Sequence, residues 1–126
     1  MRAAPDVSAY ASRGKNKIAV LVWHYHDDDL PGAAAEINLQ LSGISFAGAA
    51  KSKHYRIDAD HSNAYEAWKK MGSPVPLSEK DFSVLEKAGQ LAELKSEKNI
   101  SISNGVAEIK FTLPRQGVSL LVITAP

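Results

Sequence analysis

Residues 106–126 read VAEIKFTLPRQGVSLLVITAP and contain two strand-like segments joined by one turn. In the first segment apolar and polar residues alternate, so that one face carries Ala107, Ile109, Phe111 and Leu113. Alternation with a period of two indicates a strand with one buried face. The second segment is an almost unbroken apolar run, which is typical of a strand buried on both faces. This stretch therefore predicts two strands packed in a β-rich core.

The same two patterns recur along the whole chain. Strand-like segments lie at 7–13, 17–26, 35–43, 53–60, 99–103, 106–114 and 118–126. Residues 17–26 begin with apolar side chains on both faces, so we expect a central strand there. Short connections rich in turn-forming residues separate most of these segments. About seven short antiparallel strands predict an all-β sandwich that forms one domain over residues 1–126.

The segment KHYRIDAD (53–60) is predicted to be a strand with one solvent-exposed face. Its apolar residues Tyr55, Ile57 and Ala59 alternate with polar residues, which are His54, Arg56, Asp58 and Asp60. Because a half-buried strand normally turns its apolar side inward, we expect this polar face to be solvated. Asp58 and Asp60 would then be ordinary surface carboxylates.

A two-helix insertion, at about 62–90, is predicted between the strands. Asn63 stands three residues before Glu66, which is the spacing of a capping box, and three large side chains follow at helical intervals, namely Tyr65, Trp68 and Met71. The second helix repeats this design, with Ser78 and Asp81 as its cap and an apolar stripe made of Phe82, Leu85 and Ala88. Helices this short are unstable alone in water, so we expect both to pack against another surface.

The composition excludes several classes of protein. The chain has 15 basic and 14 acidic residues, so there is no surplus of positive charge that would favour binding to nucleic acid or to an anionic membrane. The chain has no cysteine, and therefore no disulfide and no thiolate site. No apolar run could span a bilayer, and the N-terminus does not resemble a signal peptide. None of these features selects a compartment, which for a bacterial protein would be the cytoplasm or the periplasm.

One stretch, VLVWHYHDDD (20–29), has the residue types of a metal site. His24 and His26 project from one face of a strand, and Asp27 to Asp29 could add oxygen ligands. The alternative is a polar strand end followed by an ordinary exit turn. Since His-x-His without a defined third ligand is a weak signal, the second interpretation is favoured and neither a metal nor another cofactor is expected.

Signals for catalysis are missing from the sequence. No carboxylate has the apolar surroundings that would raise its pKa for acid catalysis. The chain also lacks the common nucleophile, phosphate-binding and zinc-protease motifs. Aromatic residues could instead stack on sugar rings, and the candidates are Trp23, Tyr25, Tyr55, Tyr65 and Trp68. We expect about four of these five to belong to the core, with Trp68 the least securely placed there.

One long run carries a specific resemblance. Residues 56–91 read RIDADHSNAYEAWKKMGSPVPLSEKDFSVLEKAGQL, which closely resembles the C-terminal region of β-xylosidases of glycoside hydrolase family 39. The segment VLVWHYHDDDLPG (20–32) is similar to a strand of that family, and FTLPRQGVSLL (111–121) is similar to its closing hairpin. The resemblance extends from about Val7 to the last residue.

The resemblance implies a domain without catalytic residues. Members of that family carry a (β/α)₈ barrel with two catalytic glutamates, and the acid/base belongs to an Asn-Glu dipeptide. This sequence has no Asn-Glu dipeptide, and a chain of 126 residues is too short for such a barrel. The implied role is therefore a non-catalytic accessory sandwich, inactive alone, that packs on the barrel of a retaining β-xylosidase acting on xylo-oligosaccharides.

The helical insertion is then the best candidate for a functional surface. Its candidates for contacting the barrel or the rim of its sugar pocket are His61, Ser62, Asn63, Tyr65, Trp68 and Met71, with His24 and His26 as secondary candidates. If the barrel normally covers these side chains, some should be exposed here and could favour self-association. The alternative from another class is a free-standing carbohydrate-binding module.

Overall fold

A computed structural model describes residues 6–27, 30–95 and 99–126. Its elements follow in the order β1 (Asp6–Arg13), β2 (Lys17–Tyr25), β3 (Ala35–Leu41), β4 (Gly48–Ile57), α1 (Ala64–Lys70), α2 (Glu79–Ala88), β5 (Ala92–Leu94), β6 (Asn99–Ile102), β7 (Ala107–Leu113) and β8 (Val118–Thr124). The predicted strands are all present, although β4 begins earlier than expected. The additional strand β5 has only three residues, too few to show a period in the sequence.

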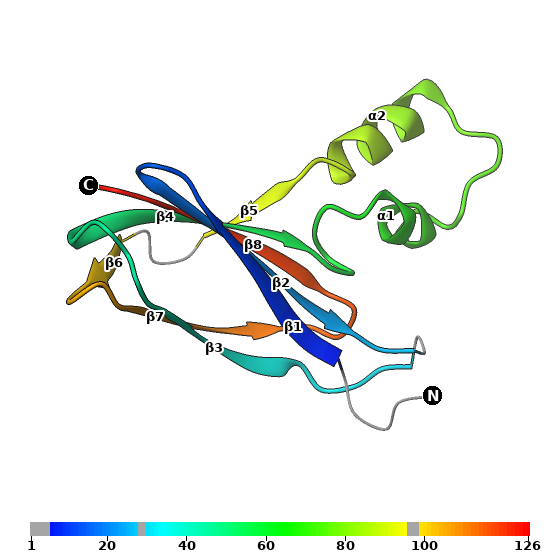
Figure 1. The fold of residues 1–126 in the computed structure, drawn as a ribbon. Coiled ribbons are helices and arrows are strands. Elements are labelled where there is room, and N and C mark those ends of the chain that lie inside the picture. Colours follow the sequence, from blue (N-terminus) through cyan, green and yellow to red (C-terminus); the bar gives the residue numbers. More distant parts are fainter. Residues whose placement is uncertain (1–5, 28–29, 96–98) are drawn as a thin grey trace.

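The strands form two antiparallel sheets. The large sheet has the order β1-β2-β8-β4-β5, with β6 also paired to β4, and the small sheet consists of β3 and β7. Figure 1 shows β3 and β7 as a layer on one side of the large sheet, and the two helices beyond the end of the sandwich. The predicted all-β sandwich with a two-helix insertion is confirmed. Strand β2 lies between β1 and β8, so its prediction as a central strand is also confirmed.

The turn between β7 and β8 connects the two sheets. Strand β7 pairs with β3, whereas β8 pairs with β2 and β4, so the expected closing hairpin is wrong. Gln116 takes a positive φ of 61°, and the Gly117 amide donates to the Pro114 carbonyl oxygen at 2.9 Å. A Cβ at Gly117 would lie 2.7 Å from that same oxygen, so the turn needs glycine there.

The core lies between the two sheets and consists of two apolar clusters. One contains Val20, Val22, Ile37, Leu113 and Leu121, and the other contains Ala50, Ile102, Ala107 and Ile123. The inward face predicted for 106–114 is confirmed, since Ala107 and Leu113 are buried and Ile109 and Phe111 pack against the clusters.

The orientation predicted for β4 is wrong. His54, Arg56 and Asp58 are buried, whereas Tyr55 is half-buried and Ile57 is 44% exposed on the opposite face. The polar side of this strand faces the small sheet, and its apolar side faces outward. A charged strand face can be buried only where each of its polar groups has a hydrogen-bond or ion-pair partner. His54, Arg56 and Asp58 therefore need such partners.

The expectation that most aromatic residues belong to the core is also wrong. Tyr25 and Tyr65 are exposed, and Trp23, Tyr55 and Trp68 are half-buried. Three of the five, Trp23, Tyr25 and Tyr55, lie on the outer face of the large sheet, which the small sheet does not cover. Both faces of β2 are apolar in sequence, but only one of them meets the core.

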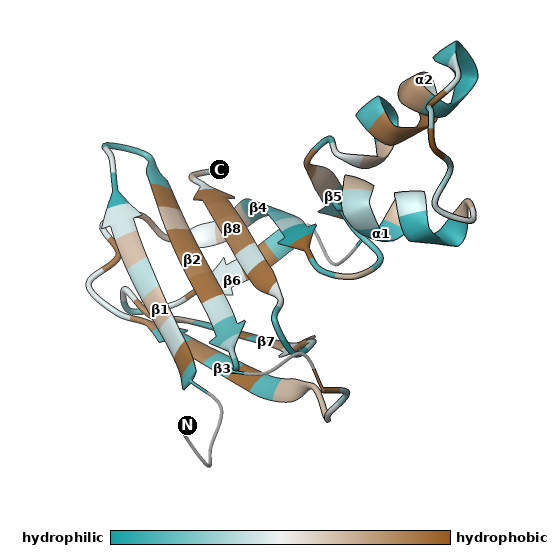
Figure 2. Cartoon of the chain, turned by 90° about the vertical axis from the view of Figure 1, so that its right-hand side faces the viewer, coloured by the Kyte–Doolittle hydropathy of each residue, from teal (hydrophilic) through white to brown (hydrophobic). Residues whose placement is uncertain are grey.

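Both helix caps are formed as predicted. The Asn63 side chain accepts a hydrogen bond from the Glu66 amide, and Ser78 and Asp81 make a reciprocal capping box at the start of α2. Neither helix contains a buried residue. Figures 1 and 2 show the helices projecting from the end of the large sheet, on the side away from β3 and β7. Among the described residues, no helix has the length and apolar character needed to cross a membrane.

Candidate functional site

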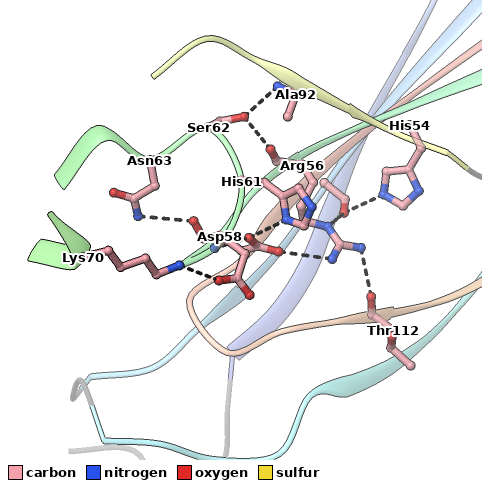
Figure 3. Close-up of polar contacts among 11 residues, drawn as sticks. His54, Arg56, Asp58, His61, Ser62, Asn63, Lys70, Ala92 and Thr112 are labelled. Atoms are coloured by element: carbon pink, nitrogen blue, oxygen red, sulfur yellow. Dashed lines mark hydrogen bonds and ion pairs between the residues drawn. The ribbon is translucent and has the colours of Figure 1, made fainter. Parts of the chain in front are cut away.

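The chain leaves β4 through a tight turn organised by Asp58. One carboxylate oxygen, Oδ1, accepts a hydrogen bond from the Asp60 amide at 2.8 Å and another from His61 Nδ1 at 2.8 Å. The other oxygen lies 3.5 Å from Arg56 Nη1. Figure 3 shows these groups converging on the Asp58 carboxylate. A buried carboxylate is thus surrounded by donors, as its charge requires.

Arg56 joins three strands from both sheets. Its Nε donates to Ser119 Oγ on β8 at 2.8 Å, and its Nη2 donates to the Thr112 carbonyl oxygen on β7 at 2.9 Å. With Asp58 at the remaining side, the guanidinium uses its planar set of donors in three directions. We infer that Arg56 fixes the position of the β4 end relative to the small sheet, and with it the start of the helical insertion.

His54 completes this buried network. Its Nε2 is hydrogen-bonded at 2.7 Å to Ser119 Oγ, which also accepts from Arg56 Nε. Burial, aided by the positive charge of Arg56, lowers the pKa of His54 from 6.5 to about 4. A serine beside a histidine can be a nucleophile, but Ser119 is fully buried and no substrate can reach it. This pair is structural.

The pKa of Asp58 reflects opposing influences. Burial alone would raise it, but hydrogen bonds from His61, the Asp60 amide and Arg56 stabilise the carboxylate. The net result is a pKa below the usual value for aspartate. Asp58 is therefore ionised at neutral pH and is unsuited to act as a proton donor there.

His61, Ser62 and Asn63 connect the network to the helices. Ser62 has a positive φ of 57°, and its hydroxyl donates to the Arg56 carbonyl oxygen and accepts from the Ala92 amide of β5, both at 2.7 Å. Asn63 donates to the Asp58 carbonyl oxygen at 3.2 Å while it caps α1. The polar groups of these three candidates hold the base of the helical insertion (Figure 3).

The candidates on α1 form the accessible part of the site. The Tyr65 ring is stacked on the Trp68 ring, with centroids 5.9 Å apart, and the Lys69 ammonium lies 4.8 Å from the Tyr65 centroid. Tyr65 is 63% exposed, while Trp68 and Met71 are half-buried and Trp68 Nε1 donates to the Pro74 carbonyl oxygen. The expected exposure is confirmed for Tyr65. Other exposed apolar side chains nearby are Val75, Leu77, Phe82, Val84 and Leu91.

His24 and His26 lie apart from this site. His24 is buried, and its Nδ1 donates to the Leu113 carbonyl oxygen at 3.1 Å. His26 Nδ1 lies 2.6 Å from an Arg115 guanidinium nitrogen and therefore accepts from it. Asp28 and Asp29 lie outside the described residues, and within residues 6–27, 30–95 and 99–126 no three His, Asp or Glu side chains are grouped to hold a metal. His24 therefore lies in the core and not at an exposed polar strand end, and both imidazoles bond to the end of β7 or to the turn that follows it.

The buried network is the feature that the sequence alone did not reveal. Ser119 and Thr112 follow Arg56 by 63 and 56 positions, so no local pattern connects them. The available signal was the pair Arg56 and Asp58, which are opposite charges two residues apart and hence on the same strand face. On a solvated face this ion pair would add little to the stability of the fold. Between two sheets it allows both charges to be buried.

The domain is a β-sandwich with a protruding pair of helices, and several solved structures share this fold. The chain superposes on the GH39 enzyme from Xanthomonas axonopodis pv. citri with a TM-score of 0.78 and 17% identity over 94% of its residues. It matches a monomeric β-xylosidase from Caulobacter crescentus CB15 with a TM-score of 0.72 and 19% identity over 93%. It also matches a bacterial orthologue of human α-L-iduronidase with a TM-score of 0.77 and 16% identity over 95%.

The chain spans about a quarter of these larger proteins, namely 26%, 26% and 22% of their lengths. No family model and no curated protein matches the chain. The particular fold is therefore that of one portion of GH39 enzymes, the family whose C-terminal region the sequence resembles. This similarity concerns the fold.

Proposed function

We propose that this chain is the non-catalytic C-terminal accessory domain of a retaining β-xylosidase of glycoside hydrolase family 39. The parent enzyme would hydrolyse the β-1,4-xylosidic bonds of xylo-oligosaccharides at a (β/α)₈ barrel. The observation that carries the proposal is the fold match, which covers almost all of this chain but only about a quarter of each neighbour. The motif-rich resemblance of residues 56–91 supports the same assignment.

The contacts of the polar residues support a non-catalytic role. His54, Arg56, Asp58 and Ser119 are buried and bonded to one another or to nearby residues, which leaves no accessible acid, base or nucleophile among them. A retaining glycosidase needs two carboxyl groups facing one glycosidic bond. The chemistry is therefore assigned to the barrel, and this domain has a supporting role.

The helical insertion is proposed to pack on the barrel and to shape the rim of its sugar pocket. Its helices bury no side chain within the described chain, although their apolar residues are numerous. The turn formed by His61, Ser62 and Asn63 fixes the base of the insertion to the sandwich. A rigid base with an exposed apolar end is suited to contact between domains, where ligand sites commonly lie.

Activity measurements test this assignment. The isolated chain is expected to release no 4-nitrophenol from 4-nitrophenyl β-D-xylopyranoside above the buffer rate, because its sequence lacks both the barrel and the Asn-Glu dipeptide that carries the acid/base in the family it resembles. The complete gene product, which we expect to include an upstream barrel with an Asn-Glu dipeptide, should hydrolyse the same substrate. Turnover by the pure chain that one carboxylate substitution abolishes, or a gene without an upstream barrel, would contradict the proposal.

A free-standing sugar-binding module is the second candidate, favoured by the exposed Tyr65 ring that is stacked on the half-buried Trp68. Aromatic faces of this kind can stack on sugar rings. Tryptophan fluorescence during titration with xylohexaose separates the two functions. Saturable binding that is lost in both Tyr65→Ala and Trp68→Ala, with the circular dichroism spectrum intact, would support the module. No change in fluorescence is expected for the accessory domain.

A further inference from the structure

We propose that the outer face of the large sheet is the principal surface on which the parent barrel docks, with the helical insertion as its flank. This inference rests on the proposed function and adds a surface that the sequence did not indicate. The outer apolar face is defined by two complete rows across β2, β8 and β4. One row is Leu21, Leu120 and Tyr55, and the other is Trp23, Val118 and Ile57.

The outer apolar face is uncovered in the described part of the chain. Leu21 is 38% exposed and Ile57 is 44% exposed, and the other four residues are half-buried. Their neighbours on the opposite face of the same strands, such as Val22 and Leu121, are almost completely buried. Figure 2 shows apolar residues along β2 and β8 and no helix lying across these strands.

An antiparallel sheet that faces water on one side normally carries polar residues there. Single exposed apolar residues are common, but six contiguous ones on three adjacent strands form a patch of the kind that marks an interaction site. Folding of this domain does not require them, since the core lies on the other side of the sheet. A partner that covers them explains why they are apolar.

The shape of the surface indicates a large, folded partner. Ile57 is the last residue of β4, and the Asp58 turn leads directly from it to α1. The helices lie at this end of the sheet, on the side away from the small sheet (Figure 1). The outer apolar face and the helical insertion therefore meet at a corner, and a convex protein body can contact both at once.

The charges on the same face specify the chemistry of that partner. The end of the sheet remote from the helices carries Lys17, Lys51 and Lys53, whose partners on β8 are Thr124 and Val122. Next to the helices the face is apolar, with the exposed Glu93 of β5 beside Tyr55 at its edge. The complementary surface is thus apolar there, with a basic group opposite Glu93, and acidic toward the far end. A neutral xylan chain offers no counterpart for these lysines, and four of the six residues in the rows are not the flat aromatics that stack best on sugars.

Two matched lysine substitutions test this surface in the complete gene product. Leu21→Lys places a charge within the outer apolar face, at the β2 end of one row, and the control Val106→Lys places one at a turn residue that is 45% exposed and lies outside that face. In the isolated chain both variants are expected to melt within a few degrees of the wild type. In the complete product, Leu21→Lys should lower the melting temperature by about 5 °C or more, because the interface would bury an unpaired charge, while Val106→Lys should not.

Zero-length carbodiimide cross-linking of the complete product provides a second measurement, with expected links from Lys51 or Lys53 to carboxylates of the barrel. The inference would be overturned if the two lysine variants of the complete product had the same melting temperature and no such cross-links formed. The proposed function would still stand if the complete product hydrolyses xylosides, and it would fail if no barrel is encoded. Xylohexaose quenching of Trp23 fluorescence in a Trp68→Phe background, if lost in Leu21→Lys, would assign the face to sugar and overturn the proposal.

Discussion

Replacing Arg56 with methionine is expected to destabilise the isolated domain by about 3–5 kcal/mol, the usual loss when one partner of a buried ion pair is removed. The substitution keeps an unbranched side chain but removes the donors to Ser119, Asp58 and the Thr112 carbonyl oxygen. A buried carboxylate would lose its guanidinium partner, and β4 would lose its direct link to the small sheet. Urea unfolding followed by circular dichroism measures the free energy of unfolding.

Arg13→Met is the matched control, because Arg13 is exposed and makes one long hydrogen bond of 3.4 Å. We expect that control to change the free energy of unfolding by less than about 1 kcal/mol. A loss of similar size in the two variants would show that the buried network contributes little. The proposal that Arg56 positions the base of the helical insertion would then have to be abandoned.

Acidification from pH 7 to pH 4 is expected to cost the domain about 3 kcal/mol through His54 alone. The folded-state pKa of His54 is about 4, below its ordinary value of 6.5. Between these two pH values the unfolded chain binds a proton that the folded chain does not, so stability falls as pH decreases. Above pH 6.5 the contribution is fully present, and at pH 4 it is largely lost.

The variant His54→Gln isolates this effect, because glutamine keeps a hydrogen-bonding group near Ser119 but does not titrate. Its free energy of unfolding should be lower than that of the wild type at pH 7 and should change less between pH 6.5 and pH 4. Asp58 affects stability in a separate pH range. Because its pKa is lowered in the folded state, its contribution to the free energy of unfolding is present above about pH 4 and is lost at lower pH. Parallel pH profiles for the wild type and His54→Gln would contradict the assignment.

Features set by local sequence were predicted well. The strands were found because apolar residues alternate or cluster between turn formers, and the caps at Asn63 and Ser78 depend on residues only three positions away. The resemblance over residues 56–91 then placed the helices within a sandwich. These properties depend on short spacings, which a single sequence displays directly.

Features set by contact between distant segments were not predicted. The period of β4 defines two faces, but which face turns inward depends on Ser119 and Thr112, far along the chain. The same limit applies to β2, where two apolar faces gave no indication that one would remain uncovered. For the candidate site, the sequence indicated His61, Ser62 and Asn63, but their attachment to the Asp58 network depends on the fold.

Hydrogen exchange in the helical insertion tests the central claim, that this chain is an accessory domain packed on a larger catalytic body. In the isolated chain, amides of residues 64–88 should exchange rapidly, because the helices bury no side chain of their own. In the complete gene product the same amides should exchange at least about tenfold more slowly, as packing of the apolar faces against the barrel would suppress local opening. Equal exchange of these residues in the two proteins would contradict the account.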